Sequence, residues 1–273
     1  MFKAHWGMQF NPFESTSTVT STATSTFTFT STDYQAASSR LKYLSEHCGF
    51  GLFTGGPGTG KTFTLRCFLS ELNRNLYKVY YTPLSTVTTM DFYRNLALGL
   101  DLAPAFHKVM LFRQIQERIT SLHKDKRITP VIVLDEGQYL NTAVINDLKI
   151  LFNFDMDSTS RAVVIISGLP SLSTILLKQI HEAVVQRIIV RYCFQGLSRS
   201  DTELYIMQGL HACGASDKII SPAAVEAFSN ASAGSLRKLN SLLTSALILG
   251  ASSHLDSINP DTVMAAFNDL NAA

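Results

Sequence analysis

The stretch GLFTGGPGTGKTF, residues 51–63, joins a short apolar run to a glycine-rich turn that ends in lysine and threonine. The pattern G-x-x-x-x-G-K-[ST] is complete from Gly55 to Thr62. Glycines let backbone amides wrap around phosphate groups, and the start of a following helix adds a favourable dipole. The stretch therefore predicts a strand, a phosphate-binding turn and a helix, in that order, holding a nucleoside triphosphate.

The residues expected to contact the nucleotide are all members of this stretch. They are Gly55, Gly56, Pro57, Gly58, Thr59, Gly60, Lys61, Thr62 and Phe63. The Lys61 ammonium is expected to reach the β- and γ-phosphates of ATP, and the Thr62 hydroxyl to bind Mg²⁺. The alternative is a glycine-rich turn that binds nothing, which the flanking strand and helix patterns disfavour.

Five apolar runs alternate with helical patterns up to residue 195. The runs are 50–54, 78–83, 129–136, 161–167 and 187–194, and the helical patterns are 33–48, 60–76, 89–100, 106–125, 142–154 and 170–185. The run TPVIVLDE is apolar at consecutive positions, which is typical of a strand buried on both faces. Strands that alternate with helices form parallel sheets. We expect a three-layer α/β domain with a five-stranded parallel sheet over residues 33–195.

After residue 195 the strand patterns stop and four helical patterns follow. They cover residues 198–212, 221–231, 234–250 and 260–271. Pro222 and Pro260 stand at first helical positions, where the missing N–H of proline costs no helical hydrogen bond. We expect a small all-helical domain over residues 196–273.

Residues 15–32 form a Ser/Thr-rich segment in which every even position from Thr16 to Thr32 is threonine. Period-two alternation of β-branched residues is compatible with an extended strand. Low complexity with little to bury is equally compatible with a flexible surface arm, which we favour. Residues 1–32 are thus expected to lie outside the α/β domain.

Net charge, cysteine content and apolar runs limit the kinds of protein that this sequence can be. The formal net charge is +2 over 273 residues, so a globally cationic nucleic-acid binder is not indicated, although a local basic patch is compatible. The four cysteines form no CxxC pair and fit inert thiols in a reducing compartment. No apolar run reaches the roughly 18 residues of a membrane span, and the start lacks a secretory signal. We expect a cytoplasmic protein.

Polar residues end two of the predicted strands. Asp135 closes the run VIVLD and is expected to hold Mg²⁺, while Glu136 is expected to orient or deprotonate the attacking water. This pair indicates hydrolysis rather than a passive nucleotide switch. Ser167, at the end of the fourth run, could bond the attacking water or the γ-phosphate, or simply begin the turn SGLP.

Two arginines are candidates for contact with the γ-phosphate. Arg187 stands at the start of the fifth run, and Arg237 lies near the start of the helical pattern at 234–250. A planar guanidinium suits the charge that develops on the phosphoryl oxygens. If Arg187 comes from a neighbouring subunit, hydrolysis requires assembly. The alternative for both arginines is a surface ion pair.

In this order, the phosphate-binding turn, VIVLDEGQ, Ser167, QRIIVRY and GSLRKLN resemble the AAA+ ATPases of the ExeA/TniB/TnsC group. The segments HWGMQFNPF and GLSRSDTELYIMQGL resemble the group's opening motif and its entry into the helical lid. The resemblance spans the chain except for the Ser/Thr-rich segment. It implies a P-loop AAA+ fold with a C-terminal helical lid.

The resemblance also implies roles for individual residues. Asp135 and Glu136 fall on the Walker B pair, Arg187 on the arginine finger and Arg237 on sensor 2 of the lid. The opening motif would place Asn11, Pro12 and Phe13 beside the nucleotide base. There are three departures from the group. Gly137 stands where the group usually has alanine. Leu236 stands where the group's G-x-P-R stretch has proline, and Ser167 replaces the usual sensor 1 asparagine.

For function, the resemblance implies an ATPase that assembles with ATP as a ring or filament on duplex DNA and regulates a partner transposase. One alternative is an ExeA-like ATPase that assists secretin assembly in type II secretion. We favour transposition because ExeA-like proteins carry a membrane span and a wall-binding region after the ATPase, and this sequence shows neither. A helicase-loading ATPase of replication is a further alternative.

DNA binding of this kind would be independent of sequence and sensitive to salt. The best local candidate is the basic stretch 107–127, in which we select Lys108 and Arg113 as DNA contacts. Glu117 and Asp125 lie in the same stretch, so a solvated amphipathic helix is an equal alternative.

Overall fold

Runs rich in valine, isoleucine and aromatic residues form one parallel sheet, as the sequence predicts. Its strands are β1 (Gly49–Gly55), β2 (Tyr77–Pro83), β3 (Thr129–Asp135), β4 (Val163–Gly168) and β5 (Ile188–Phe194). The strand order is β2-β3-β4-β1-β5, and every pair is parallel. The computed structural model describes residues 2–14, 29–83, 88–155 and 159–272.

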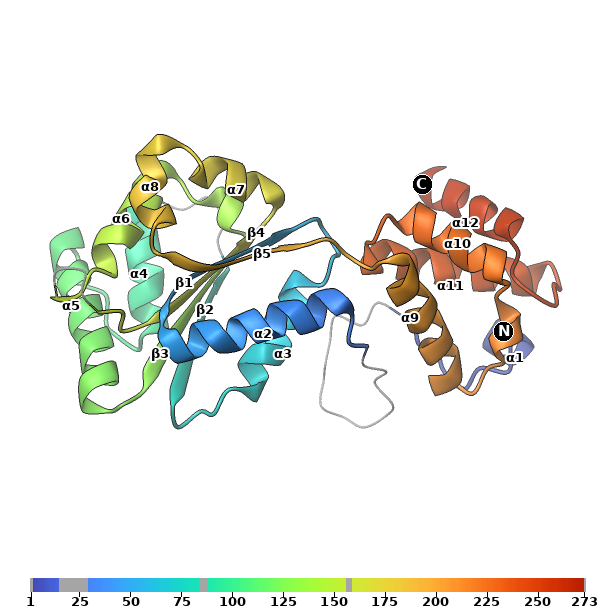
Figure 1. Ribbon diagram of the computed structural model, residues 1–273, viewed down its shortest axis with the longest axis horizontal. Helices are drawn as coiled ribbons and strands as arrows, with labels where there is room; N and C mark the ends of the chain where they lie inside the picture. Colours follow the sequence, from blue (N-terminus) through green and yellow to red (C-terminus); the bar gives the residue numbers. More distant parts are fainter. Residues whose placement is uncertain (1, 15–28, 84–87, 156–158, 273) are drawn as a thin grey trace. The chain divides into compact units, whose positions relative to one another are not determined.

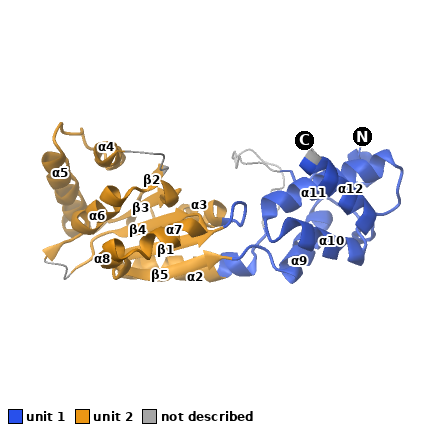
Figure 2. Cartoon of the chain, turned by 90° about the horizontal axis from the view of Figure 1, so that it is seen from above, with its two compact units in different colours: residues 1–35, 56–60, 195–273 blue, residues 36–55, 61–194 orange. Residues whose placement is uncertain are grey.

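The chain divides into two units, which are coloured separately in Figure 2. The sheet unit contains residues 36–55 and 61–194. The helical unit contains residues 1–35, 56–60 and 195–273. Each unit is described by itself below.

Alternate residues of the central strands face two separate helical layers. Val131 and Val133 pack with α2 (Thr32–His47) and α3 (Lys61–Glu71), while Ile132 and Leu134 pack with helices of the other layer. Figure 1 shows α2 and α3 on one face of the sheet, and α4 (Thr89–Gly99), α6 (Thr142–Leu151), α7 (Pro170–Leu176) and α8 (Glu182–Val185) on the other. Burial on both faces explains why these strands are apolar at consecutive positions. The three-layer α/β prediction is confirmed.

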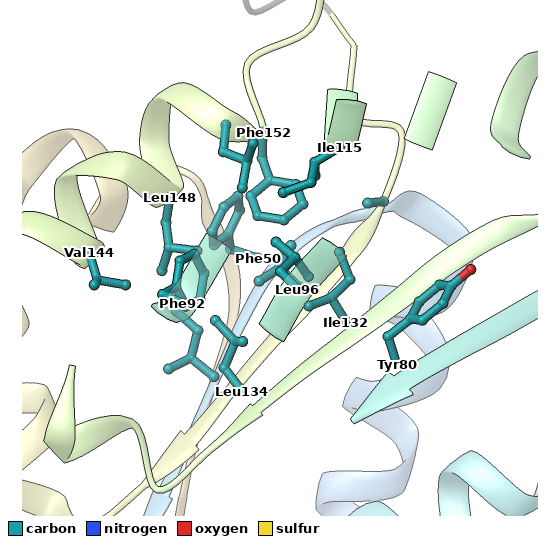
Figure 3. Packing of buried hydrophobic residues seen from close by; sticks show 14 of the residues in the cluster. Phe50, Tyr80, Phe92, Leu96, Ile115, Ile132, Leu134, Val144, Leu148 and Phe152 are labelled. Carbon is teal, nitrogen blue, oxygen red and sulfur yellow. The ribbon is translucent and has the colours of Figure 1, made fainter. Parts of the chain in front are cut away.

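The larger apolar core lies on the face covered by α4 and α6. Figure 3 shows Phe92 and Leu96 of α4 and Leu148 of α6 around Ile132 and Leu134 of the sheet. All of these side chains are almost completely buried. This core fixes β3, and therefore fixes the residues that follow it.

Two helical patterns end earlier or divide differently from the prediction. The helix expected over 60–76 ends at Glu71, because the Asn73 side chain accepts the Asn75 amide and closes a turn instead. The stretch expected over 170–185 divides into α7, a 3-10 turn at Gln179–His181 and α8. The stretch 106–125 becomes α5 (Lys108–Thr120) followed by a π-helical turn, Ser121–Asp125.

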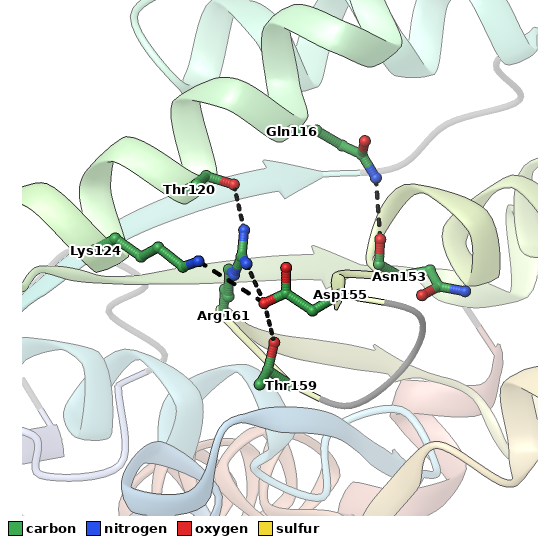
Figure 4. Close-up of polar contacts among 7 residues, drawn as sticks. All are labelled: Gln116, Thr120, Lys124, Asn153, Asp155, Thr159 and Arg161. Carbon is green, nitrogen blue, oxygen red and sulfur yellow. Dashed lines mark hydrogen bonds and ion pairs between the residues drawn. The ribbon is translucent and has the colours of Figure 1, made fainter.

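A buried arginine ties the segment between α6 and β4 to α5, as Figure 4 shows. The Arg161 guanidinium donates to the Thr120 hydroxyl at 2.8 Å and to the Asp155 carboxylate. The Thr159 hydroxyl donates to the same carboxylate at 3.0 Å. Because a buried charge is costly unless it is paired, this network accounts for an arginine at the start of a buried strand.

The helical unit has its own apolar core, built from the C-terminal helices and the N-terminal segment. Its helices are α1 (Phe2–His5), α9 (Arg199–Ala212), α10 (Pro222–Ser232), α11 (Leu236–Ser252) and α12 (Pro260–Ala272), with a 3-10 turn at Asp217–Ile219. Trp6, Met8 and Phe13 are buried in this core. The Trp6 ring nitrogen donates to the Leu247 carbonyl at 2.9 Å. The sequence did not predict α1 or this use of the N-terminal segment.

The end of the Ser/Thr-rich segment is fastened to α9. Asp201 caps α9 and accepts the amide and hydroxyl of Thr32 at 3.3 and 2.7 Å, and the hydroxyl of Ser198 at 2.9 Å. The Phe29 ring lies 5.4 Å from the Tyr205 ring. The rest of that segment, residues 15–28, lies outside the described residues, so the choice between strand and arm stays open.

Over the ranges that the structure describes, no helix combines the length and the apolar character that crossing a bilayer would require.

The Asp201 cap predicts a specific dependence of stability on pH. Burial alone raises the pKa of Asp201, but hydrogen bonds from Thr32 and Ser198 outweigh it and lower the pKa below its ordinary value. The cap therefore stabilises the folded state fully above the unfolded pKa of about 4, and this contribution is lost as pH falls through the lower folded pKa. We expect Asp201→Asn to lower the free energy of unfolding by about 1–2 kcal/mol at neutral pH.

Urea unfolding followed by Trp6 fluorescence measures this effect, because Trp6 is the single tryptophan and lies in the helical core. The difference between wild type and variant should be constant between pH 6 and 7 and should shrink below about pH 4. A difference that persists unchanged at pH 3 would contradict the assigned role of the carboxylate.

Candidate nucleotide-binding site

The carboxyl ends of β1, β3 and β4 form the edge of the sheet where the predicted chemistry lies. Ser167 of β4 pairs with Phe53 of β1, and Ile166 pairs with Leu134, the residue before Asp135. Ligands of open parallel sheets bind outside the carboxyl ends of the strands. The strand order therefore places Asp135 and Ser167 on the neighbouring strands β3 and β4, and β4 in turn pairs with β1.

Lys61 and Thr62 open α3, directly after the glycine-rich turn. The Lys61 ammonium donates to the Gly55 carbonyl, the last residue of β1, at 2.7 Å. Thr62 is exposed, and Phe63 is partly buried with the Arg66 guanidinium 5.8 Å from its ring. The lysine is thus held at the carboxyl end of β1, where a phosphate group could replace the carbonyl as its partner.

The Asp135 carboxylate is buried and hydrogen-bonded. One oxygen accepts the Glu136 amide at 3.0 Å, and the other accepts the Tyr81 hydroxyl at 2.8 Å. Tyr81 belongs to β2, the strand paired with β3. Burial, the hydrogen bond to Asp135 and the carboxylates of Asp135 and Glu136 raise the pKa of Tyr81 to about 12. Within the described ranges Asp135 forms no ion pair, which leaves its charge available to a cation.

Glu136 has a strained backbone and an oriented side chain. Its φ angle is 57°, in the left-handed region that few non-glycine residues adopt. Its carboxylate accepts a hydrogen bond from the Gln138 side-chain NH₂ group at 2.6 Å. The side-chain carbonyl oxygen of Gln138 accepts one from the Leu169 backbone amide at 3.0 Å. Gln138 therefore links Glu136 to the first residue after β4. Backbone strain of this kind collects at functional sites.

Ser167 is completely buried, and its hydroxyl has no hydrogen-bond partner among the residues that the structure describes. A buried polar group in this state costs about 1–3 kcal/mol. A contact of this hydroxyl with the attacking water or the γ-phosphate would supply the missing partner, and it stays a prediction.

The middle of the glycine-rich turn, residues 56–60, belongs to the helical unit, where it contacts the start of α11. The Ser235 hydroxyl donates to the Pro57 carbonyl at 3.2 Å, and the Leu236 amide donates to the Gly58 carbonyl at 3.0 Å. Arg237 is exposed, and its Cβ lies 3.0 Å from the position that a Cβ on Gly58 would take. Arg237 thus lies close to the glycine-rich turn, and its role in sensing the nucleotide stays a prediction.

Arg187 lies at the other end of the sheet. It precedes β5, and its carbonyl accepts the amide of Phe50 near the start of β1. Its guanidinium donates to the carbonyl of Lys149 in α6. Since Asp135 and Glu136 follow the carboxyl end of β3, Arg187 faces away from them in its own chain.

The opening motif contributes to the helical core rather than to an exposed surface. Phe13 is buried, and its ring lies 5.8 Å from the Tyr205 ring. The Asn11 side chain accepts the Phe13 amide at 3.1 Å and donates to the Thr244 hydroxyl at 3.3 Å, and Pro12 is partly buried. A base contact by these residues stays a prediction.

The two selected DNA contacts have different surroundings. The Lys108 ammonium forms an ion pair with the Asp147 carboxylate at 2.6 Å and lies 5.5 Å from the Tyr93 ring. Arg113 is exposed on the same helix, α5. Because its charge is already compensated, Lys108 is the weaker of the two candidates.

Sequence reasoning missed Tyr81, Gln138, the Ser235 hydroxyl and the Leu236 backbone amide. Gln138 follows Glu136 by two residues inside the quoted motif VIVLDEGQ, so it could have been considered. Tyr81 could have been found only from the pairing of β2 with β3, because 54 residues separate it from Asp135. Nothing in the sequence indicated that α11 contacts the turn.

Comparison with known proteins agrees with this geometry. A family model described as an AAA domain matches residues 44–176. The chain is 30% identical over 218 residues to the general secretion pathway protein A of Aeromonas hydrophila. The matched region covers 78% of this chain and 39% of that protein. The chain thus covers well under half of the length of this curated relative.

Several solved structures share this fold at low sequence identity. Cdc6p of Pyrobaculum aerophilum has a TM-score of 0.66 at 14% identity, covering 93% of this chain and 69% of that chain. The Drosophila ORC bound to DNA has a TM-score of 0.64 at 17% identity, covering 93% and 64%. The Thermotoga maritima RuvB Holliday junction branch migration motor has a TM-score of 0.55 at 20% identity, covering 87% and 67%.

At these identities the structural matches establish the fold alone. The chain has the P-loop AAA+ fold, with a parallel five-stranded sheet and a mostly helical C-terminal region. The match to the AAA domain over residues 44–176 and the similarity to the secretion protein agree with this fold.

The bond between Tyr81 and Asp135 can be tested without nucleotide. With a pKa of about 12, the Tyr81 hydroxyl should stay protonated to pH 11. Asp135→Asn removes the carboxylate and should lower the pKa of Tyr81, because a neighbouring negative charge disfavours tyrosinate. NMR of ¹³Cζ-labelled tyrosine measures both values, and Tyr81→Phe assigns the signal. A wild-type midpoint near pH 10 would show that the bond does not form.

Proposed function

We propose that this chain, an ATPase of the AAA+ type, binds ATP with Mg²⁺, self-associates as a ring or filament and acts on duplex DNA with a partner transposase. The observation that carries the enzymatic part is the pair Asp135 and Glu136 at the carboxyl end of β3, on the same edge of the sheet as the end of β1 and separated from it by β4. The DNA and transposase parts rest on the sequence resemblance.

The phosphates of ATP would be held by the amides of residues 56–60 and by the Lys61 ammonium. For Mg²⁺, the chain offers a buried carboxylate at Asp135 and an exposed hydroxyl at Thr62. Oxygen donors of this kind suit Mg²⁺, so the residues present fit the ion. Bound there, Mg²⁺ would neutralise charge on the phosphates.

Glu136 is the best candidate for the general base. Its carboxylate is exposed, and Gln138 fixes one of its oxygens. A carboxylate in this position can orient a water molecule and accept its proton as the γ-phosphate bond breaks. Ser167, on the neighbouring strand, would supply a hydrogen bond to that water or to the phosphate. Arg237 would contact the γ-phosphate, the role that the resemblance implies for it.

Arg187 would complete the site of a neighbouring subunit. It precedes β5, an edge strand of the sheet, and lies at the end of the sheet opposite to Asp135. To act as a finger its guanidinium must leave the Lys149 carbonyl, which a γ-phosphate with its greater charge would favour. Hydrolysis would then depend on assembly.

Two observations bear on the choice of process. Proteins of the same fold include the Drosophila ORC described as bound to DNA, which favours a DNA-associated role at the level of fold. The second candidate is an ExeA-like role in secretion, and the homology to the general secretion pathway protein A favours it. ATP-dependent, salt-sensitive retardation of random duplex DNA would support the first candidate, and its absence would support the second.

Glu136→Gln should trap ATP-bound assemblies on DNA, because it retains the shape of the side chain but removes the base. We expect sedimentation with ATP and duplex DNA to show long-lived oligomers of the variant, while wild type dissociates as ATP is consumed. Lys61→Ala, which should weaken phosphate binding, is the control that should not assemble. A Glu136→Gln protein that sediments as a monomer with ATP and DNA would contradict the mechanism.

Arg187→Ala should bind nucleotide normally but lose at least about 10³-fold in turnover, the usual effect of removing a finger arginine. Arg191→Ala is a matched control, because Arg191 lies in β5, which Arg187 directly precedes, and also donates to a backbone carbonyl, that of Val185 at 3.0 Å. Steady-state phosphate release and binding of a fluorescent ATP analogue separate the two effects. Normal turnover of Arg187→Ala would assign the finger role to another arginine.

A further inference from the structure

Two carbonyls of the glycine-rich turn are hydrogen-bonded to the first residues of α11. The Ser235 hydroxyl donates to Pro57 at 3.2 Å, and the Leu236 amide donates to Gly58 at 3.0 Å. We propose that Ser235 and Leu236 are positioning residues that hold this turn ready for phosphates before the nucleotide arrives. The proposal rests on the proposed function, in that the turn must bind a nucleotide.

Because of peptide geometry, these two hydrogen bonds also orient the backbone amides of Gly58 and Thr59. In a trans peptide the carbonyl and the next amide point in opposite directions, and the described residues contain no cis peptide bond. Fixing the carbonyls of Pro57 and Gly58 toward α11 therefore directs the amides of Gly58 and Thr59 away from it. Those amides are the donors that a phosphate-binding turn offers to its ligand.

One of these amides, that of Thr59, makes only a long hydrogen bond that a phosphate oxygen could replace. The Thr59 amide contacts the Gly56 carbonyl at 3.5 Å, a long hydrogen bond, while the Thr59 hydroxyl donates to the same carbonyl at 2.8 Å. Because the hydroxyl keeps that carbonyl satisfied, a phosphate oxygen can take over the amide without leaving an unpaired group.

The approach of α11 requires glycine at position 58. Gly58 has a φ angle of 77°, and an added Cβ would lie 2.4 Å from the Ser235 hydroxyl oxygen. Gly58 thus serves the contact with α11 as well as the turn itself. An alanine here would displace the donors that orient the turn.

The first residue of α11 is not a proline. The helices α7, α10 and α12 begin with Pro170, Pro222 and Pro260, whereas α11 begins with Leu236. Proline is favoured at this position because the first amide of a helix has no helical partner. In α11 that amide has a partner outside the helix, the Gly58 carbonyl, which a proline could not serve. The ATPase group that the sequence resembles has proline at this position. The need for an N–H at the start of α11 gives a physical reason for leucine here.

Leu236→Pro isolates the amide, because proline suits the first turn of a helix and removes only the N–H from the backbone. One neutral hydrogen bond corresponds to about a 2- to 10-fold change in a binding constant. We expect Leu236→Pro to bind fluorescent ATP and ADP analogues about 2- to 10-fold more weakly. Leu236→Ala, which retains the N–H, should restore the wild-type affinity. Trp6 fluorescence reports whether each variant retains the helical core.

Ser235→Ala provides a second, independent variant. It removes the bond to Pro57 together with the cap of α11, whereas Ser221→Ala removes only the equivalent cap of α10. Weaker nucleotide binding by Ser235→Ala, with unchanged binding by Ser221→Ala, would support the proposal even if Leu236→Pro fails to fold. Equal binding by the two serine variants would overturn it.

The outcomes separate this proposal from the function on which it rests. If wild type and Lys61→Ala both fail to bind ATP, the proposed function is wrong and the positioning role falls with it. If wild type binds ATP and Lys61→Ala does not, but folded Leu236→Pro binds as wild type does, then only the positioning role is wrong.

Discussion

The parallel pairing of β3, β4 and β1 is the constraint on which the candidate site depends. Parallel strands place their carboxyl ends along one edge, so a strand that ends in Asp135 and a strand that ends near Ser167 become neighbours. Both strands are buried on two faces, and this burial fixes their register more firmly than hydrogen bonds alone could. A register slip of one residue would turn Asp135 from the site toward a helical layer.

The order of the strands adds a second consequence. Since β2 lies beyond β3, Tyr81 comes beside Asp135, and the carboxylate gains a neutral donor in place of a cation. A neutral donor orients the carboxylate and leaves its charge uncompensated. The Asp135 carboxylate is therefore oriented by a residue of β2, a strand that contains none of the motifs identified in the sequence.

The sequence was sufficient for the features that depend on local pattern. All five strands, the phosphate-binding turn and the helical C-terminal region were predicted, because consecutive apolar residues and helix caps act over a few positions. The sequence was not sufficient for contacts between distant segments. The link from Glu136 through Gln138 to Leu169 depends on side-chain geometry, and the burial of Trp6 depends on a helix 241 residues away. The divided stretch at 170–185 had a continuous helical pattern, so tertiary packing decided its form.

Buried polar groups in this chain fall into two classes, and the difference bears on how a site is recognised. Arg161 and Asp201 are buried with several partners each, and they stabilise local structure. Ser167 and His181 are buried without a hydrogen-bond partner among the described residues. Desolvation lowers the pKa of His181, which favours the neutral ring, and the residue ends the 3-10 turn between α7 and α8. An unsatisfied group alone therefore does not identify a site. Ser167 differs because it lies at the shared strand edge, close in the sheet to a strained glutamate and a buried carboxylate, where a phosphate or water could become its partner.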